Sequence, residues 1–235
     1  MKLKKRKTQI GVGGTVITPL HKRLVAEVLD SGRLTYGPFL KRFEAEFAKR
    51  HARRFAVSTN SGTSALIAAL GTLKALDGWK DGDEVIVPAL TFIATSNAVL
   101  HNGLWPVFAD VDARTFHIDP AEIEKRITKK TRAIMPVHLW GVSCEMAPIM
   151  KIARRRGLRV INDSAQALGV NHRGAPVGSE GDIACYSTYV SHIVTTGEGG
   201  MLLTNDPKIA VGVRSMISHG RDSIYLAADD DRGLS

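Results

Sequence analysis

Residues 54–76, RFAVSTNSGTSALIAALGTLKAL, join a short apolar segment to a long helical one through a turn of small polar residues. The segment Arg54–Thr59 has the composition of a buried strand, and Gly62–Leu76 is long and apolar enough for a buried helix. Ser61 is a favoured residue for the start of that helix. The same strand–turn–helix unit recurs further along the chain, so this stretch predicts the architecture of the whole.

Strand-like and helix-like segments alternate from residue 54 to residue 219. Further strands are expected at Glu84–Ala89, Trp105–Val111, Arg132–His138, Arg159–Asp163, Asp182–Thr188 and Gly200–Asn205. Helices are expected between them, at about 91–101, 121–127, 145–156 and 207–219, after an N-terminal helical segment with a turn at 35–38. This alternation predicts an α/β fold with a mostly parallel sheet flanked by helices. Ligands of such sheets bind at the carboxyl ends of the strands.

The composition is that of a globular protein with a sizeable core. Of the 235 residues, 44% are hydrophobic and 23% are charged, which excludes a disordered chain. The net charge is +9, and five of the positive charges lie in one N-terminal tail: Lys2, Lys4, Lys5, Arg6 and Lys7. We expect residues 1–14 to form a solvated basic arm, and we expect no nucleic-acid partner because no DNA- or RNA-binding motif accompanies the arm.

Cysteines and apolar runs limit the compartment and the cofactors. Cys144 and Cys185 are the two cysteines and form no CxxC pair, so a disulfide framework and a four-cysteine metal or iron–sulfur site are excluded. We therefore expect no metal. No apolar run reaches the roughly 20 residues of a membrane helix, and the basic N-terminus is not followed by a signal-like apolar segment. A cytoplasmic protein that does not enter the membrane is expected.

Polar residues gather after the predicted strands. The turn 60–64 could bind a phosphate at a helix N-terminus, or Ser61 could simply cap the helix. Asp163 ends an apolar strand and could be the counter-ion of a cofactor cation, or an N-cap of the next segment. The glycine-rich turn 195–200 could be a plain hairpin, and His138 and His192, each taken alone, could be structural.

Five motifs that occur in order carry a resemblance to one family: Gly62–Leu66, Pro88–Thr95, Pro136–Gly141, Asn162–Ala167, and Gly181–Ser187 through Thr195–Gly200. They resemble the DegT/DnrJ/EryC/StrS-type sugar aminotransferases, which are fold-type-I enzymes dependent on pyridoxal 5′-phosphate (PLP). The resemblance covers residues 15–220 and implies that they form the PLP-binding large domain. It also implies that residues 221–235 begin a connection to a C-terminal small domain that is absent or truncated in this chain.

The resemblance also implies residue roles. Gly62 and Thr63 would hold the cofactor phosphate with Ser187, Phe92 would stack on the ring, Asp163 would pair with the ring nitrogen, and Gln166 would contact the ring hydroxyl. Weaker candidates for substrate contact are Thr35, Tyr36 and His138. The partners implied are a nucleotide-linked ketosugar, glutamate as amino donor, and a second copy of the chain in a homodimer.

One position departs from the aminotransferase pattern. The Schiff-base lysine of those enzymes lies five residues after the phosphate-binding serine, and this sequence has His192 there. The nearest lysines in sequence are Lys151 and Lys208. The substitution resembles a branch of 4-keto-6-deoxysugar 3-dehydratases, in which a histidine moves protons on pyridoxamine 5′-phosphate (PMP). We therefore predict C3 dehydration with His192 as acid and base; the alternatives are a sugar aminotransferase and a non-catalytic PLP-binding protein.

Overall fold

The computed structural model describes residues 15–221. The predicted basic arm at 1–14 and nearly all of the predicted connection at 221–235 lie outside these residues. Within the described part, no helix is long and apolar enough to cross a membrane. Residues 15–221 also contain no group of three or more histidine, cysteine or acidic side chains placed to hold a metal ion.

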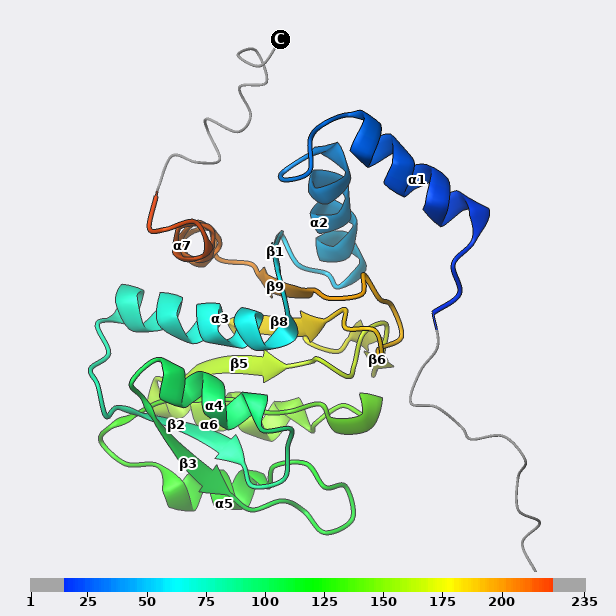
Figure 1. Ribbon diagram of the computed structural model, residues 1–235. Coiled ribbons are helices and arrows are strands. Elements are labelled where there is room, and N and C mark those ends of the chain that lie inside the picture. Colours follow the sequence, from blue (N-terminus) through cyan, green and yellow to red (C-terminus); the bar gives the residue numbers. More distant parts are fainter. Residues whose placement is uncertain (1–14, 222–235) are drawn as a thin grey trace, which may run out of the picture.

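A seven-stranded sheet forms the centre of the molecule (Figure 1). Its strands, in spatial order, are β1 (Phe55–Thr59), β9 (Gly200–Thr204), β8 (Ile183–Ser187), β5 (Arg159–Asp163), β4 (Thr131–Ile134), β2 (Glu84–Pro88) and β3 (Trp105–Ala109). All pairs are parallel except those that β9 makes with β1 and β8. The predicted α/β fold with a mostly parallel sheet is confirmed.

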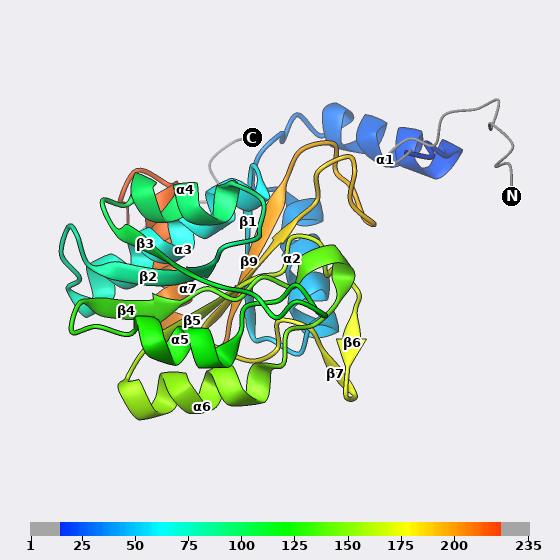
Figure 2. The same ribbon diagram turned by 90° about the horizontal axis from the view of Figure 1, so that it is seen from below.

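Helices cover both faces of the sheet (Figures 1 and 2). One face packs against α3 (Gly62–Asp77), α4 (Ala94–His101) and α7 (Pro207–Ile217). The other packs against α2 (Pro38–Arg50), α5 (Pro120–Arg126) and α6 (Met146–Arg156). Strand residues alternate between the two cores: Val85 and Val87 lie in the first, and Ile86 lies in the second. This period of two is the reason for the continuous apolar runs in the sequence.

Some elements differ from the predicted ranges. The predicted strand Arg132–His138 ends at Ile134, and the chain then reaches a short 3-10 turn, η1 (Leu139–Gly141). A small hairpin of β6 (Asn171–His172) and β7 (Ala175–Pro176) was not predicted, because strands of two residues carry no periodicity. The predicted N-terminal helical segment is two helices, α2 and α1 (Pro19–Asp30), and none of the residues of α1 is buried.

The sheet brings the ends of distant strands to one edge. The strands β2, β4, β5 and β8 run parallel. Because β1 and β8 both run antiparallel to β9, β1 points the same way as β8. The segments that follow these strands therefore meet at the carboxyl edge, where a ligand site is expected.

Candidate active site

A cavity of about 370 Å³ opens at this carboxyl edge. It receives side chains from the turn before α3, the β2–α4 loop, the end of β5 and the segment after β8. It brings together all seven residues that the sequence predicted for the cofactor and the catalytic step: Gly62, Thr63, Phe92, Asp163, Gln166, Ser187 and His192. These residues are up to 130 positions apart (192 − 62) in the sequence, so the fold itself assembles the cavity.

One end of the cavity is the amino terminus of α3. Ser61 caps the helix, since its hydroxyl accepts the Ser64 N–H at 3.1 Å, so the capping role is real. The amides of Gly62 and Thr63 belong to the first helical turn, where N–H groups have no acceptor within the helix. A Cβ on Gly62 would lie 2.8 Å from the Cβ of Ser187, so only glycine allows this close approach. The N–H groups and the helix dipole suit a phosphate.

Ser187 lies beside this helix end, at the last position of β8. Its side chain is buried, and its oxygen accepts the Tyr189 N–H at 3.2 Å. The hydroxyl proton therefore remains for a second partner, and an anionic oxygen in the cavity is the natural acceptor. The residue is positioned to add one donor to those of α3.

Asp163 ends β5 and faces the cavity while being 5% exposed. Its Oδ2 accepts the Thr95 hydroxyl at 2.8 Å and its Oδ1 accepts the Ala165 N–H at 3.2 Å. Burial raises the pKa of the carboxyl group, and these two donors oppose that rise. No ion pair to Asp163 occurs within residues 15–221, so a buried carboxylate faces the cavity without a cation.

Gln166 has its side-chain amide fixed in one orientation. The Trp140 N–H donates to its Oε1 at 2.6 Å, and a backbone donor can only be met by the oxygen. The Nε2 group therefore remains as a donor for the cavity, which Gln166 lines. The backbone of Trp140 has φ of 57°, a conformation that residues other than glycine rarely adopt, so this contact depends on a strained turn.

His192 lies on a loop that leaves β8 and returns to β9. Threonines close the base of the loop: the Thr188 and Thr196 hydroxyls are 2.7 Å apart, and Thr196 N donates to Thr188 O. Gly199 has φ of 154°, and a Cβ there would lie 2.4 Å from the Thr188 hydroxyl. The glycine-rich turn is therefore the closed stem of the loop that holds His192.

The His192 ring is suited to accept a proton near neutral pH. Partial burial lowers its pKa from the ordinary value near 6.5, and the charge of Asp163 opposes that change. The Tyr189 ring lies edge-on at 6.4 Å, between ring centroids. A neutral imidazole beside a cavity is able to act as a general base and, once protonated, as a general acid.

The charge of the cavity is unusual. Its lining from the described residues includes two carboxylates, Asp163 and Glu198, with His192, and no lysine or arginine. Neither Lys151 nor Lys208 is in the lining. Phe92 is 69% exposed at the mouth, although a large aromatic side chain is normally covered. Both features indicate a site that a flat, partly cationic ligand would complete.

His138, for which the sequence left sugar contact and a structural role open, lies in the core. The side chain is 1% exposed and is not in the cavity lining. Its Nδ1 accepts the Cys144 N–H at 3.1 Å, so its Nε2–H donates to Asn162 Oδ1 at 3.1 Å. Burial lowers its pKa to about 4. Both ring nitrogens are used within the core, so His138 is a structural residue.

Thr35 and Tyr36 lie apart from the cavity. They belong to the turn between α1 and α2, and Tyr36 lines a different cleft with residues of α2 and β1. Residues 15–221 therefore do not bring this turn together with the other predicted site residues.

Sequence reasoning placed Thr91 and the segment after Ser187 at the ends of the strands but gave several residues of the site no role. Thr95 is buried against Asp163, and the cavity lining also includes Thr91, Ser191 and Glu198. Thr91 and Thr95 are four positions apart at the start of a helix, which would place their side chains on one face. That spacing was the available signal, although it does not identify Asp163 as the partner.

Comparison with known proteins gives a consistent result. The model of the DegT/DnrJ/EryC1/StrS aminotransferase family matches residues 16–231. GDP-perosamine synthase of Caulobacter vibrioides is 45% identical over 199 residues, which are 84% of this chain and 53% of that protein. The chain spans about half the length of the curated relatives it matches.

Solved structures show the same fold. The DesV structure from S. venezuelae is 40% identical with a TM-score of 0.82, over 87% of this chain and 54% of that one. The E. coli GDP-4-keto-6-deoxy-D-mannose-3-dehydratase with bound hydrated PLP is 29% identical with a TM-score of 0.84, over 89% of this chain and 54% of that one. The expected large-domain fold of PLP enzymes is confirmed.

Proposed function

Because this chain belongs to the DegT/DnrJ/EryC1/StrS aminotransferase family, we propose that it is part of an enzyme that uses PLP and PMP to modify a nucleotide-linked 4-ketosugar. More specifically, we propose removal of the C3 hydroxyl in deoxysugar biosynthesis. One observation carries this choice: the cavity has His192 and, among the described residues, no lysine for a Schiff base.

The residues present fit the cofactor. The amide donors of Gly62 and Thr63 and the free hydroxyl proton of Ser187 suit its phosphate. The Asp163 carboxylate, which has no cationic partner among the described residues, suits a protonated ring nitrogen, and the Gln166 Nε2 suits the ring hydroxyl. The exposed Phe92 ring suits stacking on a flat heterocycle.

Each of these site residues then has a definite role in the proposed reaction. When bound, PMP would supply an amine for the sugar ketone and a protonated ring that withdraws electrons. His192 would accept a proton at the C4′ methylene and pass it to the departing C3 hydroxyl. Asp163 would keep the ring nitrogen protonated, while the N–H groups at the start of α3 would hold the phosphate in place. Glutamate would restore PMP, with His192 again moving the proton.

Transamination is the second candidate. It is favoured by the 45% identity to a GDP-perosamine synthase, which exceeds the 29% identity to the dehydratase structure. In that reaction the sugar gains an amine at C4 and keeps its C3 hydroxyl. A third candidate is a protein that binds the cofactor without turnover.

We also propose that the chain forms a homodimer. The helix α1 buries none of its residues, and Figure 1 shows it standing away from the sheet. Its side chains Leu20, Val25 and Leu29 are at least half exposed. A 12-residue helix with no buried residue is marginal in water, so a second copy that covers these exposed apolar side chains would stabilise it. Sedimentation of the protein and of Leu29→Glu tests the proposal, since the charge should dissociate the dimer.

The proposed reaction is tested on the longest natural form of the protein. The protein is loaded with PLP, reduced with borohydride and weighed intact, and any adduct is mapped. We expect tight cofactor binding without a phosphopyridoxyl adduct on lysine. GDP-4-keto-6-deoxymannose, PMP and glutamate are then supplied, and the sugar product is followed by NMR.

The product separates the candidates. Loss of the C3 hydroxyl supports dehydration. A 4-amino sugar with the C3 oxygen retained, or a stable adduct on a lysine, would overturn dehydration in favour of transamination. Binding of cofactor without any product would support the non-catalytic candidate, and absence of cofactor binding would contradict all three.

A further inference from the structure

We propose that Thr95 is a positioning residue that orients the Asp163 carboxylate toward the ring nitrogen of the cofactor, with Thr91 behind it in a chain of two hydroxyl groups. The inference rests on the proposed function, because it concerns the group that Asp163 would bind. It assigns a task to two threonines that the reaction itself does not use.

The geometry fixes both oxygens of Asp163. The Thr95 hydroxyl lies in the first turn of α4 and donates to Oδ2 at 2.8 Å, while the Ala165 N–H donates to Oδ1 at 3.2 Å. Thr95 is fully buried, with no exposed surface. The plane of the carboxylate is therefore set by the protein before any ligand binds, and its remaining lone pairs face the cavity that Asp163 lines.

The count of protons gives the hydroxyl chain a direction. The Thr91 and Thr95 hydroxyl oxygens are 2.8 Å apart, and either could be the donor. An ionised carboxylate only accepts, so the Thr95 proton is committed to Asp163. Thr91 must then donate to Thr95, and the chain runs from Thr91 through Thr95 to Asp163. Each bond in such a chain strengthens the next, so Thr91 supports the ionised form of Asp163.

A second buried threonine, Thr72, shows that a buried threonine hydroxyl in this fold does not always find a hydrogen-bond partner. Thr72 in α3 is 1% exposed, and its hydroxyl has no hydrogen-bond partner within residues 15–221. The fold thus tolerates a buried threonine hydroxyl with no task. Thr95 differs because its hydroxyl contacts the Asp163 carboxylate, which forms no ion pair within residues 15–221. Thr72 is therefore the matched control for a substitution of threonine by valine.

The test compares two probes on the full 235-residue chain. PMP has a ring nitrogen, and its 1-deaza analogue has C–H in that place, so only PMP can pair with Asp163. Thr95→Val should weaken PMP binding about tenfold, or about 1.4 kcal/mol, without weakening binding of the analogue. Thr91→Val should weaken PMP binding about threefold with the same selectivity. Thr95→Ser, which keeps the hydroxyl, should restore PMP binding, and Thr72→Val should change neither affinity.

The outcomes separate this inference from the proposed function. Equal loss of both probes in Thr95→Val would mean that the residue is merely structural, and no loss would mean that it has no role; either result overturns the inference. If Thr95→Val does not fold, Thr91→Val decides by the same selectivity, because Thr91 is only partly buried. If the unmodified chain binds neither probe, the proposed function fails and the inference fails with it.

Discussion

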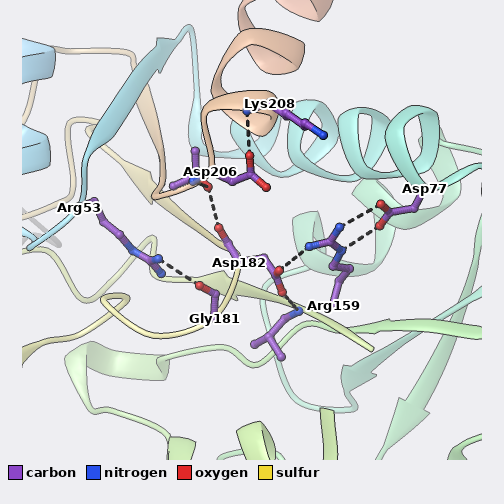
Figure 3. A network of polar contacts seen from close by, with 9 residues as sticks. Arg53, Asp77, Arg159, Gly181, Asp182, Asp206 and Lys208 are labelled. Carbon is purple, nitrogen blue, oxygen red and sulfur yellow. Dashed lines mark hydrogen bonds and ion pairs between the residues drawn. The ribbon is translucent and has the colours of Figure 1, made fainter. Parts of the chain in front are cut away.

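Charged side chains are paired differently at the amino edge of the sheet, where the parallel strands begin, and at the carboxyl edge, where they end. At the amino edge, Arg159 joins Asp77 at 2.8 and 2.9 Å and Asp182 at 2.7 Å, while Asp182 also accepts the Val160 N–H (Figure 3). Arg53 donates four hydrogen bonds to the carbonyl oxygens of residues 178, 180 and 181. At the carboxyl edge, Asp163 is buried with no cationic partner in the part of the chain that the structure describes, and the cavity lining there has no lysine or arginine.

This difference separates groups that stabilise the fold from groups that await a ligand. At the amino edge the partners of each charge come from the chain, so removing one leaves its partners unsatisfied. At the carboxyl edge we propose that the missing partner of Asp163 is supplied by a bound molecule. Buried groups kept in an unfavourable state are typical of functional sites. Substitutions at the two edges should therefore affect different measurements.

The largest effect is expected at the carboxyl edge, on turnover. His192→Asn removes the proposed acid and base, and turnover should fall about 10³-fold, or about 4 kcal/mol in activation free energy. The thermal midpoint and the PMP affinity should change little, because the His192 ring is only partly buried. The measurements are product formation by NMR, thermal unfolding and PMP titration.

The matched control is His101→Asn, an exposed histidine at the end of α4 outside the cavity. It should leave turnover and stability unchanged. Turnover of His192→Asn within tenfold of the unmodified protein would remove His192 from the mechanism. The acidic limb of the rate should lie below pH 6.5, because burial lowers the His192 pKa and the neutral ring is the base.

The next effect is expected at the amino edge, on stability. Arg53→Met removes a buried guanidinium and leaves three carbonyl oxygens without their donors, so unfolding should become easier by about 3 kcal/mol. Denaturant titration measures the change. PMP affinity of the folded variant should remain unchanged, since Arg53 does not line the cavity. A variant of normal stability that loses PMP binding would reverse the comparison.

A smaller effect is expected from the buried histidine between the edges. His138 keeps a neutral ring in the fold, with a pKa of about 4, against about 6.5 when unfolded. Below pH 6.5 His138 therefore binds a proton in the unfolded chain but stays neutral in the folded chain, and the free energy of unfolding falls as the pH falls toward 4. His138 should account for about 2 kcal/mol of the stability lost between pH 7.5 and pH 5.

His138→Gln isolates this contribution. The amide can still accept and donate a hydrogen bond but does not titrate, so the dependence of unfolding free energy on pH should become flatter by that amount. Other buried histidines, His51 and His117, also have lowered pKa values and remain in both proteins, so the difference reports His138 alone. An unchanged slope would contradict the assigned tautomer and burial.

Local patterns predicted much of the fold and many of the site residues. The strand–helix unit of β1 and α3 could be predicted because strand composition, the cap at Ser61 and helix spacing are all properties of neighbouring residues. Asp163 was found because it ends an apolar strand, and parallel strands bring such ends to one edge, whereas the role of Ser187 was implied by the family resemblance. Their gathering in one cavity followed from the order of elements.

The remainder depends on contacts between distant residues. Thr95 and Asp163 are 68 positions apart, and no spacing rule links them. The position of His138 at the end of a predicted strand left sugar contact and a structural role open, and its hydrogen bonds with Asn162 and Cys144 inside the core favour the structural role. The orientation of the Gln166 amide follows from the left-handed backbone at Trp140, a conformation that is not expected for a tryptophan.

The smallest effect expected is also the one that tests the comparison most directly, because its sign is opposite at the two edges. Asp163→Asn removes a buried carboxylate and should stabilise the ligand-free chain by about 1 kcal/mol at pH 7.5. Burial raises the Asp163 pKa, so the unmodified fold binds a proton more tightly than the unfolded chain does. That stabilisation is present at low pH and is lost as the pH rises through the folded pKa.

The advantage of Asp163→Asn should therefore grow as the pH rises from 4, and unfolding curves of both proteins across this range measure it. The same variant should bind PMP more weakly, since a neutral amide cannot pair with a protonated ring. Asp182→Asn is the control at the other edge: it weakens the pairing with Arg159 and should destabilise the fold. If Asp163→Asn were destabilising as well, the Asp163 carboxylate would stabilise the fold as Asp182 does. The proposal that it lacks a partner which a ligand supplies would then be wrong.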